Sequence, residues 1–151
     1  MKRNTLSFVV VLFAFAVLLA PGRSWGESTP WDQSGVTVVA TSFVEAVKKV
    51  EAELEADTEG ADVVATRKRL ALIGDVKRLR EAAGALAADL ENGQGYEETL
   101  PRYKTLQEIR ETAARQGRMI LDPESPSASI VAARKLLVEL SAYYHDEPKF
   151  P

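Results

Sequence analysis

The stretch Gly60–Asn92 has the sequence GADVVATRKRLALIGDVKRLREAAGALAADLEN, and it predicts one long amphipathic helix. Its apolar residues recur at alternating steps of four and three, which keeps them on one stripe of an α-helix: Leu72, Val76, Leu79, Ala83, Leu86 and Leu90. An isolated helix is marginal in water and gains most of its stability from burying such a stripe. Other segments of the chain must therefore pack against this one.

A second segment, residues 34–57, has the same spacing, with Ser34 as its expected N-cap. Its stripe consists of Val36, Ala40, Phe43, Val47, Val50 and Leu54. The link that follows is short and polar, so this helix and the long helix should form an antiparallel hairpin. A hairpin folded about residues 58 and 59 sets Phe43 opposite Gly74, and this predicts that the missing side chain makes room for the phenyl ring.

The hairpin also sets opposite charges side by side. The long helix carries a basic cluster of Arg67, Lys68, Arg69, Lys77 and Arg78, and the first helix carries Glu45, Glu51, Glu53 and Glu55. We interpret the basic cluster as a solvated face neutralised by the acidic helix, with a dedicated anion site as the alternative.

Two more helices are expected after the long helix, which should end in a left-handed cap at Asn92–Gly95. One begins near Thr99, with Pro101 in its first turn, and the other has Ser125 as N-cap and Pro126 at its first position. Their stripes are Leu106, Ile109, Ala113 and Ile120 in the first, and Ile130, Ala133, Leu137, Leu140 and Tyr144 in the second.

The fold class expected from these patterns is all-α, an antiparallel up-down-up-down four-helix bundle with one long second helix. The bundle domain should cover residues 34–145, preceded by a flexible arm at 27–33 and followed by an extended tail at 146–151.

Residues 1–26 have the layout of a secretory signal peptide. Lys2 and Arg3 precede an apolar run over 6–20, and the small residues Ser24 and Gly26 stand where a cut before Glu27 needs them. The run is shorter than the roughly 20 residues that cross a bilayer, although an uncleaved anchor is the alternative. We therefore expect an exported protein, periplasmic or extracellular, with no stable membrane span after cleavage. The absence of cysteine in an exported chain indicates a bacterial source.

Composition excludes several classes of function. Three of the nineteen basic residues and no acidic residue precede Glu27, which leaves 16 basic against 22 acidic residues in the rest of the chain. A surplus of negative charge argues against nucleic-acid binding. With no cysteine, the chain has no disulfide, thiolate nucleophile, iron–sulfur ligand or covalent haem attachment. We expect no cofactor.

The hypothesis that follows is a non-catalytic accessory or interaction protein of the cell envelope, which binds another envelope protein or itself. The expected contact regions are the arm with Trp31, the alanine-rich end of the long helix and the aromatic tail. Trp31 should fold back onto the bundle, because an exposed indole forgoes a large burial gain. The candidate partner-binding residues are Trp31, Ala83, Ala87, Tyr143, Tyr144 and Phe150.

A small-ligand or metal carrier is a second hypothesis. His145 is the single histidine and precedes Asp146 and Glu147, so an imidazole and two carboxylates could join in a divalent-metal site. Adjacent helical positions do not face one another, and a histidine near a helix C-terminus is favourable without any further role.

A third hypothesis is an exported all-helical enzyme. Arg69–Leu70, Asp75–Val76 and Arg80 in RLALIGDVKRLR resemble the Arg…Asp-Val…Lys helix of the exported chorismate mutases. The resemblance implies that Arg69 and Arg80 grip the two carboxylates of the substrate and that Asp89 is the acidic residue of that site. Arg80 stands where the family has lysine, and the fourth helix lacks the family's glutamine. A degenerate, inactive relative belongs to the same hypothesis.

Overall fold

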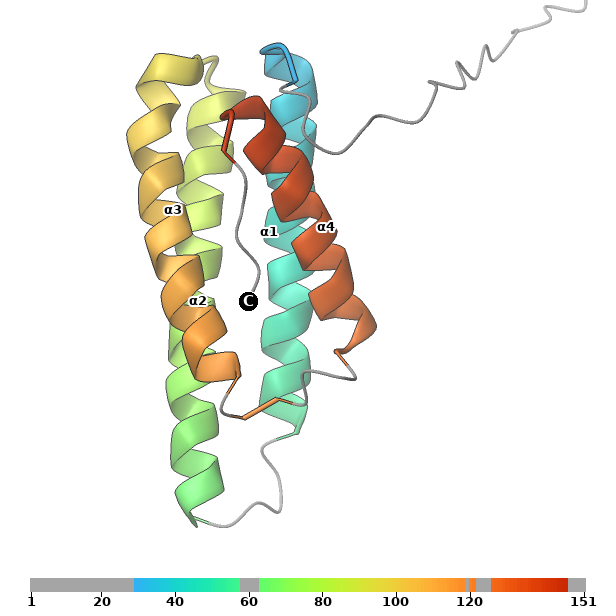
Figure 1. The fold of residues 1–151 in the computed structure, drawn as a ribbon, viewed down its shortest axis with the longest axis vertical. Coiled ribbons are helices and arrows are strands. Elements are labelled where there is room, and N and C mark those ends of the chain that lie inside the picture. Colours follow the sequence, from blue (N-terminus) through green and yellow to red (C-terminus); the bar gives the residue numbers. More distant parts are fainter. Residues whose placement is uncertain (1–28, 58–62, 119, 122–125, 147–151) are drawn as a thin grey trace, which may run out of the picture.

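The computed structural model describes residues 29–57, 63–118, 120–121 and 126–146, and all regular structure within them is helical (Figure 1). The four helices are α1 (Gln33–Ala56), α2 (Val63–Glu91), α3 (Tyr96–Gly117) and α4 (Ala128–Tyr143). This confirms the all-α class and the four helices. None of the helices in these ranges is long and apolar enough to cross a membrane. The expected signal peptide lies outside the described residues.

Three pairs of helices pack closely: α1 with α2, α2 with α3, and α1 with α4. α1 therefore lies between α2 and α4, as Figure 1 shows. The Thr41 hydroxyl, in the first half of α1, donates to Glu91 at the end of α2 over 3.3 Å. At the other end of the pair, Lys77 of α2 lies 2.9 Å from Glu55. By contrast, no Cα atom of α3 comes within 8 Å of a Cα atom of α4.

The core forms along the stripe that the sequence predicts. All six stripe residues of α2 are buried, and Leu86 is fully inaccessible to solvent. From the other three helices, Val36, Leu106 and Leu140 are equally inaccessible. Burying one such side chain stabilises the fold by roughly 1.5–3 kcal/mol. The other residues of this cluster are Ala40, Phe43, Val47, Leu54, Ile73, Ala87, Tyr103, Leu137 and Tyr144.

The start of α1 differs from the expectation. The helix begins at Gln33, and its N-cap is Asp32, whose carboxylate accepts from the Ser34 amide over 3.1 Å. The Gln33 side chain donates to the carbonyls of Leu90 at 2.8 Å and Gln94 at 3.0 Å, at the end of α2. The described part of the expected flexible arm is thus tied to the bundle, because Gln33 satisfies carbonyls that a helix end leaves unpaired.

The end of α2 agrees with the sequence prediction, and the start of α3 differs from it. Gly93 has φ +82°, and the amides of Gly93 and Gln94 return to α2 carbonyls, so the left-handed cap is confirmed. α3 begins at Tyr96, where the Gly95 amide donates to the Glu98 carboxylate over 2.7 Å. The expected start near Thr99 was late because Pro101 belongs to the second turn and not the first.

The start of α4 also differs. Its N-cap is Ser127, whose hydroxyl accepts from the Ile130 amide over 3.3 Å, and not the expected Ser125, which lies outside the described residues. Pro126 consequently precedes the helix instead of occupying its first position. The described tail begins with Asp146, and residues 147–151 fall outside the description.

The register of α1 against α2 overturns the expected role of Gly74. Glu51 lies beside Lys77 and Arg80, which sets Phe43 level with the region around Ala87. The first turns of α2 extend past the end of α1, as Figure 1 shows, so the hairpin does not fold symmetrically about residues 58 and 59. A Cβ added to Gly74 meets no atom within 4 Å. Gly74 therefore makes no room for a facing side chain.

We expect Gly74→Ala to stabilise the protein by about 0.5–1 kcal/mol, because alanine has the higher helix propensity and the new methyl meets no neighbour. Urea unfolding followed by circular dichroism measures the change. The contrasting variant is Gly35→Ala, where a Cβ would lie 2.5 Å from the Tyr143 hydroxyl and 2.6 Å from the Asp32 carboxylate, and stability should fall. A loss of stability in Gly74→Ala would show that α2 needs a glycine there.

Candidate functional site

A cluster of aromatic rings, here called the aromatic cap, closes the end of the bundle at which α3 begins and α4 ends. It consists of Trp31, Tyr96, Tyr103, Tyr144 and His145. Tyr103 and Tyr144 stack with their centroids 4.1 Å apart, and Trp31 meets Tyr144 edge-on at 5.5 Å. Large rings are needed here because the backbones of α3 and α4 do not come close.

Hydrogen bonds anchor the hydroxyls of the aromatic cap. The Tyr144 hydroxyl lies 2.8 Å from Thr99 Oγ1, and Tyr103 donates to Asp146 over 3.0 Å. Gln107 donates to the Tyr103 oxygen, while its own Oε1 is buried without a partner among the described residues. Burial raises the pKa of Tyr103, and it raises the pKa of Tyr144 to about 12. Both phenols therefore stay neutral at physiological pH.

The candidate partner-binding residues are largely engaged within the chain. Trp31 folds back onto the bundle as expected, Tyr144 is only 3% exposed, and Tyr143 is half-buried. Ala83 and Ala87 are 2% and 6% exposed and belong to the core, so they offer no surface in this chain. Phe150 lies outside the described residues.

Of the three candidate metal ligands, the structure describes His145 and Asp146. His145 adopts φ +54° just after α4, and its ring lies 5.9 Å from that of Tyr96. Asp146 accepts the hydrogen bond from Tyr103, and Glu147 is outside the described residues. Within the described ranges no three histidine or acidic side chains form a group that could hold a metal ion.

The three residues of the enzyme hypothesis each have a different intramolecular partner. Arg69 donates to the Asp57 carbonyl, and Asp89 accepts from Arg102 of α3. Arg80 Nε lies 3.0 Å from a Glu51 carboxylate oxygen, although neither atom makes an aligned hydrogen bond. Arg69 and Arg80 are about 16 Å apart along α2 by helical rise. Their partners, the Asp57 carbonyl and the Glu51 carboxylate, lie at different positions along the chain.

The basic cluster of α2 is in part neutralised by α1, as the sequence predicts. Lys77 bonds Glu55, which raises the pKa of this lysine, and it lies 3.9 Å from Glu51. Arg78 pairs within its own helix, with Asp75 at 3.7 Å. These charges form surface ion pairs, which are weak individually.

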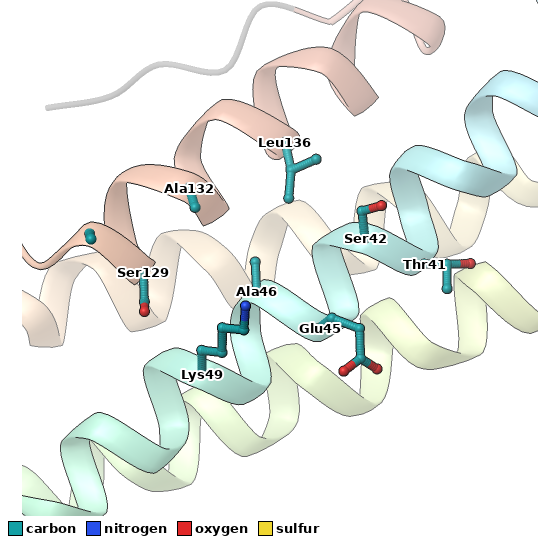
Figure 2. A pocket seen from close by; sticks show the side chains of 9 residues that line it. Thr41, Ser42, Glu45, Ala46, Lys49, Ser129, Ala132 and Leu136 are labelled. Carbon is teal, nitrogen blue, oxygen red and sulfur yellow. The ribbon is translucent and has the colours of Figure 1, made fainter.

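An open groove of about 480 Å³ runs between α1 and α4 (Figure 2). Small side chains line most of it, because α1 places Ser42 and Ala46 one turn apart and α4 places Ala128 and Ala132 one turn apart. Leu136 points towards α1 at one end in Figure 2. The lining residues are Thr41, Ser42, Glu45, Ala46, Lys49, Ala128, Ser129, Ala132 and Leu136.

Charges of both signs lie along the α1 side of this groove. Glu45 points away from α4 in Figure 2 and pairs with Lys48 at 2.6 Å. Lys49 is exposed and has no ion pair with a described residue. At the end near Ser129, the Glu53 carboxylate accepts from the hydroxyls of Ser129 and Ser127, which lowers its pKa.

Two exposed valines extend the apolar surface beside the groove. Val38 lies one turn before Ser42 on α1 and is 63% exposed, and Val131 next to Ala132 is 51% exposed. The large apolar residues of each stripe do not indicate this groove. The pattern that indicates it is a pair of small residues four apart on each of two helices that pack together.

Comparisons with protein-family models, with curated proteins and with solved structures found no match for this chain. Function is therefore inferred from the geometry described above.

Ionisation of the aromatic cap should destabilise the protein at high pH. A raised phenol pKa contributes stability below the unfolded pKa near 10, and this contribution is lost as pH rises through the folded value of about 12. We expect the free energy of unfolding to fall between those limits, and to fall less in Tyr144→Phe. Urea unfolding followed by the fluorescence of Trp31, at pH 8 and at about pH 11, measures both. Equal losses in the two proteins would contradict the assignment.

Proposed function

We propose that this protein is exported and acts in the cell envelope as a non-catalytic interaction protein, with the groove between α1 and α4 as its binding surface. In this proposal the chain is an up-down-up-down bundle whose residues 1–26 are removed on export. The observation that carries the proposal is the groove, where small side chains from two helices leave an open, mainly apolar channel.

The shape and chemistry of the groove suit a helix on the surface of another protein. Small residues allow a helix to approach the backbones of α1 and α4 closely, and ridges of one helix pack into grooves between others. Val38 and Val131 add exposed apolar surface next to the channel. Leu136 supplies an aliphatic contact at one end of the groove. Buried apolar area is the main source of affinity in most protein associations.

The remaining candidate chemistry supports a binding role over a catalytic one. Arg69, Arg80 and Asp89 are held by separate partners, and Tyr103 and Tyr144 are neutral and covered. A catalytic centre needs titratable groups that converge on a reacting atom. The groove instead offers shape, apolar surface and two opposite charges.

Export rests on the layout of residues 1–26. We expect the mature protein to begin at Glu27, and intact mass measurement of protein from the envelope fraction checks this. Gly26→Leu places a large residue directly before the cut and should leave the precursor uncleaved and membrane-bound. The matched control is Gly22→Leu, which makes the same change away from the two small-residue positions. Normal processing of Gly26→Leu would contradict the assigned cleavage position.

Binding through the groove can be tested in living cells by a photo-crosslinking amino acid at position 131, which is exposed beside the groove on α4 and does not line the channel. We expect a discrete adduct at position 131 and none at position 112, which is also exposed but lies on α3. Ala128→Arg in the same chain should remove the adduct, because a long charged side chain fills the channel. Equal labelling at positions 131 and 112 would contradict a groove-specific partner.

A further inference from the structure

We propose that the occupant of the groove is the same surface of a second copy of this chain. The layer formed by α1 and α4 would stack face to face on its counterpart, with α1 antiparallel to α1 of the other copy. This inference rests on the proposed function, since it names the partner of that binding surface.

The arrangement of small residues fits a twofold axis through the middle of the groove. Ala46 lies about midway along α1. The two helices meet near one end through Glu53 and Ser129, and near the other end Gly35 lies close to Tyr143. Between these two points, Ala132 is the groove residue of α4 nearest the level of Ala46. An axis near these two alanines brings the smallest side chains of both copies to the centre. Close approach of four helices needs such residues there.

The charges of α1 are self-complementary about that axis. Glu45 precedes Val47 by two residues and Lys49 follows it by two, so an antiparallel pairing centred at Val47 sets Glu45 opposite the partner subunit's Lys49. The twofold axis produces this ion pair twice. In the single chain Lys49 has no ion pair with a described residue, and the second copy supplies one.

The same register matches the other exposed residues of α1. Val38, at 63% exposure, falls opposite the partner subunit's Ala56, and Ser42 falls opposite the partner subunit's Ala52. In this register Val38 meets an apolar residue and Ser42 meets a small one.

A second copy accounts for this surface better than an oppositely charged protein does. A basic partner would match Glu45 and repel Lys49, and an acidic partner would do the reverse. Opposite charges at equal distances from one centre are matched by the same surface turned through half a rotation.

Charge exchange tests the inference on the mature protein by sedimentation and light scattering over a range of concentrations. We expect a dimer, which Glu45→Lys and Lys49→Glu each weaken by about ten-fold or more in Kd, since each sets like charges opposite one another twice. The double variant E45K/K49E restores complementarity and should recover most of the affinity. Lys104→Glu, the same charge change on exposed α3, should leave the dimer unchanged.

Ala132→Trp provides an independent measurement. An indole at the axis blocks the approach of the second copy, and the fold is preserved because position 132 is exposed in the single chain. Circular dichroism and urea unfolding confirm that each variant is folded. A monomer at all concentrations, or a dimer indifferent to E45K, K49E and A132W, overturns the inference. A monomer whose position 131 still crosslinks to a different envelope protein overturns the self-partner and leaves the proposed function standing. A monomer that shows no groove-specific adduct overturns both.

Discussion

The structure depends on burying the apolar stripe of α2 between α1 and α3. Leu72, Leu86 and Leu90 are almost completely covered, and α2 packs closely on both α1 and α3. α3 packs closely on no helix but α2, and α4 packs closely on none but α1. The pairs α2–α3 and α1–α4 therefore meet at α1 and α2, and on the opposite side α3 and α4 meet through side chains such as those of Gln107 and Ser141.

The aromatic cap compensates for that open side at one end. Tyr96 and Tyr103 extend from α3 to Tyr144 after α4, and Trp31 fills the space between two of these rings. Trp31 thereby packs the arm before α1 against the core. The Thr29 amide also donates to the Ala142 carbonyl over 3.2 Å. Long aromatic side chains with polar tips suit this place, because they span a wide gap and still satisfy their hydroxyls at the surface.

The helices and the burial of the stripe from Leu72 to Leu90 could be predicted from the sequence, because residues spaced alternately by four and three fall on one face of an α-helix. The left-handed cap at Gly93 could also be predicted, because that conformation favours glycine. The register of α1 on α2 could not, since it depends on how far the first turns of α2 extend beyond the hairpin. The role of Gln33 was missed because its partners are carbonyls at the far end of α2. The groove was missed because small residues carry no signal until their neighbouring helix is known.

The residues of α4 are unevenly buried, and the less buried half of this helix lines the groove. The buried residues of this helix are Leu137, Leu140 and Ser141, all in its second half, where the aromatic cap also holds it. In its first half, Ala133 packs against the core, Ala128 and Ala132 are exposed in the groove, and the hydroxyls of Ser127 and Ser129 donate hydrogen bonds to Glu53. Small residues bury little apolar area, so this half contributes little to the stability of the single chain. A helix segment that packs weakly within its own chain keeps its surface available, and covering the groove from outside would add the burial that the first half of α4 lacks.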